Sequence, residues 1–158
     1  VIANAQMDVF EIARHGSEEG MRQIFDNYPQ SINNKNSSGF TPLTIACYSN
    51  NFDVAKFLAI RVMDINVNSD VGTPLMAAVY KNNLQITKML IEEGAKVNLS
   101  DPNGTTALHY AVQFKSVDLI KLLIDNEADI TIKDNKDQSP WDYALLYNDE
   151  NILKILKN

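Results

Sequence analysis

Few side chains in this 158-residue sequence can act as nucleophiles, general bases or soft metal ligands. It has one cysteine, Cys47, and two histidines, His15 and His109. A single cysteine excludes an internal disulfide and a cysteine-based zinc site. Two histidines are too few for most metal sites built from histidine. No histidine is near Cys47 in the sequence, so a buried helix residue explains this thiol better than a nucleophile does. We therefore expect no catalytic residue, no cofactor and no metal ion.

Three aspartates near the C-terminus, Asp134, Asp137 and Asp142, raise the question of a calcium loop. Such a loop needs a glycine at its sixth position and a glutamate at its twelfth, and the stretch around these aspartates has neither residue at those positions. Short carboxylates also accept hydrogen bonds from nearby backbone amides in turns and at helix starts. We expect that capping role for these aspartates.

Charge and hydropathy exclude further classes of protein. Fourteen Lys and Arg against twenty Asp and Glu give a formal net charge of −6. Phosphate backbones repel an acidic chain, so we expect no nucleic acid partner. No apolar run approaches the roughly 20 residues of a membrane-spanning helix, so we expect no membrane insertion. Hydrophobic residues make up 45% of the sequence, which is typical of a folded domain.

The elements that must position these side chains repeat along the chain. Four alanines, Ala46, Ala78, Ala111 and Ala144, are separated by 32, 33 and 33 residues. A fixed period of this length is typical of stacked supersecondary units. Each alanine lies five residues after a Thr or Ser that can cap a helix, and prolines follow that residue in three units. A second apolar stripe at i, i+3 and i+4 follows in each unit, so each unit is predicted to be a pair of short helices.

The motif T-P-L-x-x-A at residues 41–46 and 73–78, with the segment Gly-Ala-Lys-Val-Asn at residues 94–98, resembles the ankyrin repeat family. The resemblance extends over residues 8–156. It implies an all-α solenoid of stacked helix-turn-helix units joined by β-turn loops. It also implies five repeats, of which the first and the fifth are caps because their second helices carry polar outer residues.

The expected domain organisation follows from this alignment. We expect a lead-in segment at residues 1–7 and a single ankyrin-repeat domain at residues 8–158. The repeats are expected at about residues 8–40, 41–72, 73–105, 106–138 and 139–158.

Several local features are predicted within this frame. The second unit has one residue fewer before Thr73, so its turn should be tighter than the others. His109 matches the family histidine that hydrogen-bonds the adjoining turn, which favours a structural role over general-base chemistry. Asparagines at 50, 82 and 148 and a glycine at 94 are predicted to end helices in the left-handed conformation.

The resemblance also implies a concave groove, lined by turn tips and first helices, that binds partner proteins. The candidate partner-binding residues on the turns are Phe40, Val71, Asn103, Thr105 and Lys136. Those on the first helices are Tyr48, Ser49, Tyr80, Lys81, Gln113, Phe114, Leu146 and Tyr147.

Aromatic residues recur among these candidates. Tyr48, Tyr80, Phe114 and Tyr147 are expected to form an exposed line, since aromatic side chains are enriched in interface hot spots. The alternative is that these rings pack on neighbouring repeats, as we expect of Tyr110, Trp141 and Tyr143, which fall at core positions.

The leading functional hypothesis is a non-enzymatic protein–protein interaction module, monomeric and without cofactor. Its partner is expected to be another protein, and the acidic surface favours a partner with a basic surface. The alternative is a dedicated inhibitor or immunity-type protein that occludes a bacterial effector or enzyme.

The N-terminal segment bears on localisation. Ala3-Asn4-Ala5 fits the small-x-small pattern that precedes a signal-peptidase cleavage site, with Gln6 as the mature start. A cytoplasmic location is favoured, with a periplasmic or secreted bacterial protein as the alternative.

Overall fold

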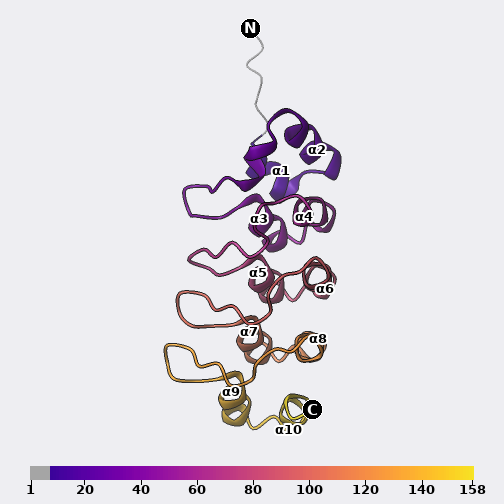
Figure 1. The fold of residues 1–158 in the computed structure, drawn as a ribbon. Coiled ribbons are helices and arrows are strands. Elements are labelled where there is room, and N and C mark those ends of the chain that lie inside the picture. Colours follow the sequence, from indigo (N-terminus) through magenta and orange to yellow (C-terminus); the bar gives the residue numbers. More distant parts are fainter. Residues whose placement is uncertain (1–7) are drawn as a thin grey trace.

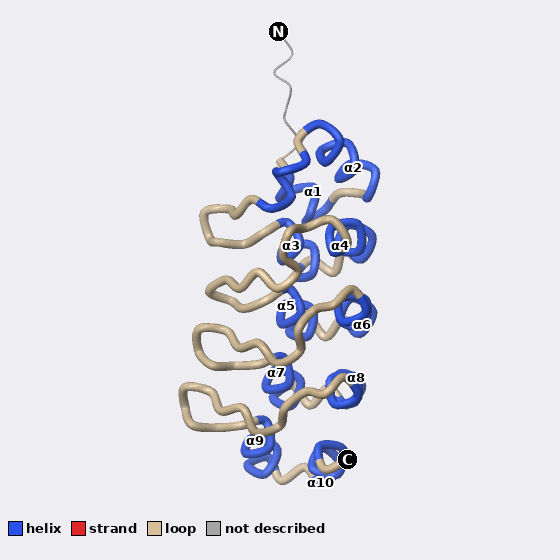
Figure 2. Tube along the Cα trace, in the orientation of Figure 1, coloured by secondary structure: helices blue, strands red, loops and turns tan. Residues whose placement is uncertain are grey.

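The computed structural model describes residues 8–158 and shows helix pairs stacked in one direction (Figure 1). The first helices of the pairs form one column: α1 (Val9–His15), α3 (Pro42–Tyr48), α5 (Pro74–Tyr80), α7 (Ala107–Gln113) and α9 (Pro140–Tyr147). The second helices form a parallel column: α2 (Glu18–Asn27), α4 (Phe52–Ala59), α6 (Leu84–Glu92), α8 (Val117–Asp125) and α10 (Glu150–Leu156). Long loops project sideways from the first column (Figure 2). The all-α solenoid is therefore confirmed.

Local sequence sets where the first helices begin. Thr41, Thr73, Thr106 and Ser139 each accept a hydrogen bond from the amide three residues later. Proline occupies the first helical position in α3, α5 and α9, where no amide hydrogen is needed. These caps satisfy amides that a short helix otherwise leaves without a partner.

Left-handed residues set where helices end. Asn50, Asn82 and Asn148 have φ of 57°, 53° and 49°, as predicted. Lys115 takes the same conformation in the fourth unit, and Glu127 takes it where the third unit has Gly94. Lysine and glutamate adopt this conformation only against a steric cost, so here the fold overrides the local preference of the residue.

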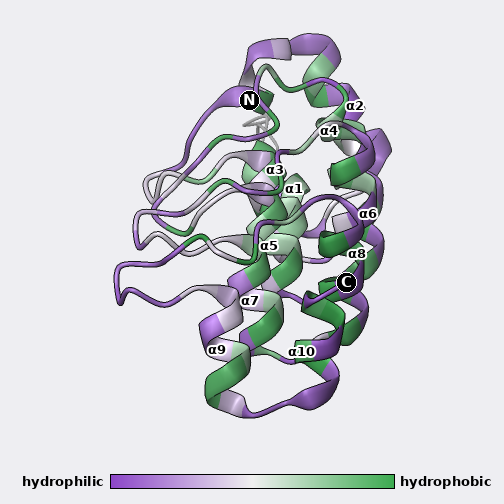
Figure 3. Cartoon of the chain, turned by 60° about the horizontal axis from the view of Figure 1, so that its bottom comes forward, coloured by the Kyte–Doolittle hydropathy of each residue, from purple (hydrophilic) through white to green (hydrophobic). Residues whose placement is uncertain are grey.

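The core runs the length of the stack between the two columns. The repeating alanines Ala46, Ala78, Ala111 and Ala144 are fully buried, together with Leu, Ile, Val and Met side chains of both columns. A methyl side chain at these positions lets adjacent first helices approach closely. Loop tips are mainly hydrophilic, and both helix columns carry hydrophobic segments (Figure 3).

Asparagine side chains connect successive repeats outside the core. Each of three asparagines accepts a hydrogen bond through Oδ1 from a backbone amide about one repeat further along. The pairs are Asn33 with the Met63 amide at 2.9 Å, Asn66 with the Lys96 amide at 2.8 Å, and Asn98 with the Asp129 amide at 2.7 Å. These bonds set the spacing of the loops that follow the second helices.

The two ends of the stack differ from the interior. In the first repeat a short 3₁₀ helix, η1 (Pro29–Asn33), follows α2 and has no counterpart in the other repeats of the described residues. In the last repeat α10 has exposed Glu150, Lys154 and Lys157, but α9 leaves Leu145 50% and Leu146 72% exposed. The polar outer face predicted for the second helix of the fifth unit is therefore confirmed in α10.

Two further observations concern the described residues. Among residues 8–158, no helix is long and apolar enough to cross a membrane. The cleavage pattern at Ala3-Asn4-Ala5 and the lead-in segment 1–7 lie outside the described residues.

Candidate functional site

The turns that precede the first helices are organised from their first residue. The Asn36, Asp101 and Asp134 side chains each accept hydrogen bonds through Oδ1 from the amides two and four residues later, at 2.8–3.1 Å. Backbone bonds then close these turns across five residues, as between the Asp101 amide and the Thr105 carbonyl at 2.9 Å. The loop tips are thereby held in one conformation.

The turn of residues 69–72 is closed differently. Its backbone bonds run from the Ser69 amide to the Gly72 carbonyl at 3.1 Å and from the Gly72 amide to the Ser69 carbonyl at 2.9 Å. Ser69 Oγ replaces the carboxylate and accepts from the Val71 amide at 3.3 Å. The turn is tighter by one residue, as predicted, and Asp70 is exposed at its tip.

Two tyrosines tie first helices to these turns. The Tyr110 hydroxyl donates to Asp101 Oδ2 at 2.8 Å, and the Tyr143 hydroxyl donates to Asp134 Oδ2 at 2.7 Å. The bond to Asp134, with a contribution from burial, raises the pKa of Tyr143 to about 12. Burial, followed by the bond to Asp101, raises the pKa of Tyr110.

The prediction that Tyr110, Trp141 and Tyr143 pack on their neighbours is confirmed, since all three rings lie against the core. All three are half-buried. The Tyr110 ring contacts Tyr80 of the preceding repeat and the Tyr143 ring contacts His109, while both hydroxyls reach carboxylates on the loops. The Trp141 ring lies at the C-terminal end, with Lys157 Nζ 5.6 Å from its centroid.

Two of the three histidine and cysteine side chains, His109 and Cys47, are buried, while His15 is exposed at the end of α1. His109 is fully buried; its Nδ1 accepts from the Thr106 amide at 3.0 Å, and its Nε2 is 2.9 Å from the Gln138 carbonyl oxygen. The ring therefore joins the cap of α7 to the next turn, as predicted. Cys47 is also fully buried, and burial raises the pKa of its thiol. Residues 8–158 contain no group of three or more His, Cys, Asp or Glu that could hold a metal ion.

Four aromatic side chains meet on the first helices and form what we call the central aromatic cluster: Tyr48, Tyr80, Tyr110 and Phe114. The Tyr80 ring is at the centre, with ring centroids 5.6 Å from Tyr48, 5.9 Å from Tyr110 and 5.3 Å from Phe114. Tyr80 remains 47% exposed and Phe114 49% exposed. The cluster spans three repeats and presents aromatic surface to solvent.

The predicted aromatic line is thus rearranged. Tyr110, assigned to the core from sequence, belongs to the cluster, and Tyr48 is half-buried against Tyr80. Tyr147 instead stacks on Tyr143 at 6.2 Å, with Lys115 Nζ 5.6 Å from its ring centroid. Alignment located the ring positions but not the directions in which the rings point.

The other candidate residues divide by exposure. Exposed are Val71, Lys81, Asn103, Lys136 and Leu146. Half-buried are Phe40, Ser49, Thr105, Gln113 and Tyr147.

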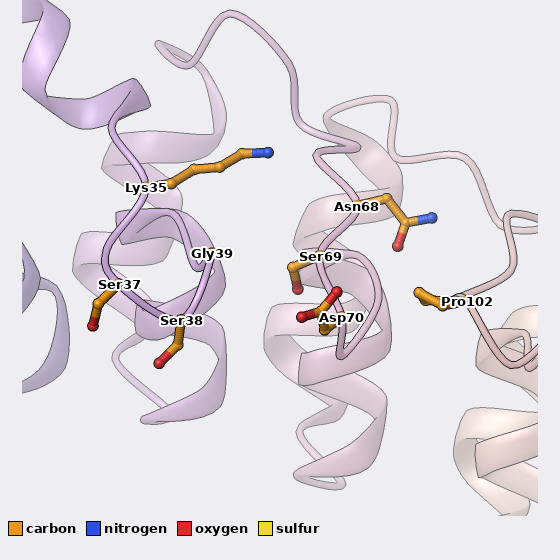
Figure 4. Close-up of a pocket in the computed structure, with 8 residues that line it drawn as sticks. All are labelled: Lys35, Ser37, Ser38, Gly39, Asn68, Ser69, Asp70 and Pro102. Carbon is orange, nitrogen blue, oxygen red and sulfur yellow. The ribbon is translucent and has the colours of Figure 1, made fainter.

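Two hollows lie between successive loops of the stack. The first, which we call the tyrosine hollow, has a volume of about 230 Å³ and is lined by Tyr48, Asp70, Val71, Met76, Ala77, Tyr80, Asp101, Asn103 and Tyr110. The second, the tip hollow, is polar and open, with Lys35, Ser37, Ser38, Gly39, Asn68, Ser69, Asp70 and Pro102 around it (Figure 4). Asp70 lines both. The Lys35 side chain extends from its own loop toward the loop of Asn68 and Ser69 (Figure 4).

Comparison with known proteins gives two findings. A family model described as "Ankyrin repeats (3 copies)" matches residues 9–101 and 75–158. A stretch of 59 residues is 37% identical to palmitoyltransferase akr1 of Aspergillus oryzae. This stretch covers 37% of the chain and 8% of that protein.

Proposed function

The chain belongs to the ankyrin repeat family, whose repeats are generally protein–protein interaction modules. From that premise we propose that it binds a partner protein through the surface formed where its first helices meet its loops. The contact surface is the central aromatic cluster together with the tips of the turns at residues 69–72 and 101–105. The chain acts by binding and carries out no reaction of its own.

The central aromatic cluster is the observation that carries this proposal. Tyr80 and Phe114 are about half exposed although other aromatic rings pack against them. Large aromatic side chains held in place by neighbours lose little conformational entropy on binding and dominate many interfaces. A surface of this kind is well suited to bury against a partner.

Rigidity of the loops supports the same proposal. The carboxylate and amide oxygens of Asp101, Asp134 and Asn36 each hold two backbone amides of their turn. Tyr110 and Tyr143 then connect the turns to the helices. Loops that are ordered before binding reduce the entropy lost when a partner docks.

The match to palmitoyltransferase akr1 carries no activity over to this chain. The matched stretch is 8% of that protein. The one thiol of this chain, Cys47, is fully buried and is therefore not placed to act as a nucleophile.

An affinity capture from the lysate of the native host tests the proposal. The bait is the wild-type chain, and the test variant is Tyr80→Ala with Phe114→Ala. The control variant is Tyr28→Ala, which removes another exposed aromatic ring, at the end of α2. Thermal unfolding of each variant verifies that the fold is retained.

A protein retained by the wild type and the control but lost by the double variant is the expected result. Retention of the same proteins by all three baits would contradict the proposal. If the captured partner is an enzyme whose turnover falls when the chain is added, the inhibitor hypothesis replaces the general one.

A further inference from the structure

The tyrosine hollow combines two kinds of chemistry in one place. Rings of Tyr48, Tyr80 and Tyr110, from three successive first helices, line its helix side. Asp70 and Asp101, from the two adjacent turns, line its loop side. Aromatic faces and carboxylates both attract cations, and both favour a cation most when water is partly excluded.

The two carboxylates differ in exposure and in how many hydrogen bonds they already accept. Asp101 is only 6% exposed and is held by the amides of Asn103 and Thr105 and by the Tyr110 hydroxyl. Asp70 is exposed at the tip of the short turn and belongs to none of the ion pairs formed within residues 8–158. The hollow therefore has a fixed negative charge in its wall and a second carboxylate available at its rim.

Several cations of the chain contact other rings or line another hollow. Arg22 and Arg61 stack on Phe57, on the second-helix side of the stack. Lys115 stacks on Tyr147, and Lys35 lines the tip hollow. Among residues 8–158, no Lys or Arg lies over the rings of Tyr48, Tyr80 or Tyr110.

We propose that the tyrosine hollow receives an arginine side chain of the partner protein. Its guanidinium plane stacks on the tyrosine rings while its N–H groups donate to Asp70 and reach toward Asp101. Arginine fits better than lysine because its planar, weakly hydrated group stacks on rings and pairs with a carboxylate through two parallel hydrogen bonds. The inference rests on the proposed function and specifies the side chain that this surface recognises.

A peptide titration tests the hollow without the partner. The probe is acetyl-Gly-Arg-Gly-amide, and the matched peptides carry lysine or citrulline in place of arginine; citrulline keeps the planar shape but has no charge. The readout is the NMR shift of the ring signals of Tyr48, Tyr80 and Tyr110. The test variant is Asp70→Asn, and the control is Asp53→Asn, which removes an exposed carboxylate in the first turn of α4.

We expect saturable shifts of these ring signals with the arginine peptide and binding about fivefold or more weaker with citrulline, because the ring and carboxylate attractions both need the charge. Asp70→Asn should weaken binding of the arginine peptide by a similar factor, and Asp53→Asn should leave that binding unchanged. Equal binding of the citrulline or lysine peptide would overturn the assignment. So would arginine-peptide binding that Asp70→Asn leaves unchanged, or shifts that do not involve these rings.

Failure of this inference is distinguishable from failure of the proposed function. If the arginine peptide does not bind but Tyr80→Ala with Phe114→Ala still loses the captured partner, the surface binds a partner without an arginine in the hollow. If the double variant keeps every partner, the proposed function fails whatever the peptide does.

Discussion

The turn of residues 69–72 is one residue shorter than the turn of residues 101–105, and the two use their carboxylates in opposite ways. In the longer turn, Asp101 is buried and its oxygens hold two amides and a tyrosine hydroxyl. In the shorter turn, a serine hydroxyl takes the first position and Asp70 is exposed at the tip. In the shorter turn a serine does the organising, and the carboxylate at the next position is left exposed where a partner can reach it.

The largest expected effect is the difference in stability between variants that remove one or the other of these two carboxylates. Asp101→Ala removes three hydrogen bonds and leaves turn amides and the Tyr110 hydroxyl without that acceptor, so we expect a loss of about 3 kcal/mol in the free energy of unfolding. Asp70→Ala should change that free energy by less than about 0.5 kcal/mol, as for an ordinary surface substitution. Urea denaturation of both variants measures the difference. Similar losses for the two would show that Asp70 is also structural.

The next effect concerns the glycines of the two kinds of turn. Gly72 has φ of 93°, and an added Cβ would collide with Met76 Sδ. Gly39 has φ of 80° in a longer turn, and an added Cβ there meets nothing within 4 Å. We expect Gly72→Ala to lower the free energy of unfolding by about 2 kcal/mol and Gly39→Ala by about 1 kcal/mol, since only the second is limited to backbone strain. Thermal and urea unfolding of the pair measure these losses, and equal values would remove the steric argument.

A smaller effect is the pH dependence of the longer turns. Burial by itself would raise the pKa of Asp134, but hydrogen bonds from the Tyr143 hydroxyl and the Gln138 and Lys136 amides lower it overall. A lowered pKa contributes stability that is present above the unfolded value, about 3.9, and is lost as the pH falls through the folded value. For Tyr143 the pKa is raised to about 12, so its contribution is present below the unfolded value and is lost as the pH rises through the folded value.

Tyr143→Phe tests both directions because it removes the shared hydrogen bond. The variant should be less stable than the wild type at pH 7 and should lose less of its stability at either extreme of pH. Tyr28→Phe, which changes an exposed tyrosine, serves as the control. Parallel stability curves for wild type and Tyr143→Phe would contradict the linkage.

The smallest expected effect is a gain in stability. Asp137 has φ of 60° at the position where the other longer turns have glycine, and it also forms an exposed ion pair with Lys133. Asp137→Gly should raise the free energy of unfolding by about 0.5 kcal/mol, because relief of backbone strain exceeds the small contribution of an exposed ion pair. Lys133→Ala, measured in parallel by urea denaturation, isolates the ion pair. A net loss in Asp137→Gly would show that the turn tolerates its aspartate without strain.

Much of the fold could be predicted from the sequence because the helix starts and the turns depend on residues that are close together along the chain. The N-caps Thr41, Thr73, Thr106 and Ser139 act on amides three residues away, and their preference for short polar side chains is local. The short turn before Thr73 was visible as a missing residue in a regular period. Lys115 and Glu127 were missed as left-handed residues because nothing in their chemistry favours that conformation.

The candidate site could be predicted from the sequence only in part, and the reason is physical. The repeat, the stacking of helix pairs and the positions of the rings along the chain could be predicted, since they follow from a fixed period and local preferences. The contact of Tyr110 with Tyr80 and Phe114, the bond of its hydroxyl to Asp101 and the exposed position of Asp70 in the same hollow became visible in the folded chain. Those outcomes depend on ring directions and on contacts between adjacent repeats, which a one-dimensional alignment does not specify.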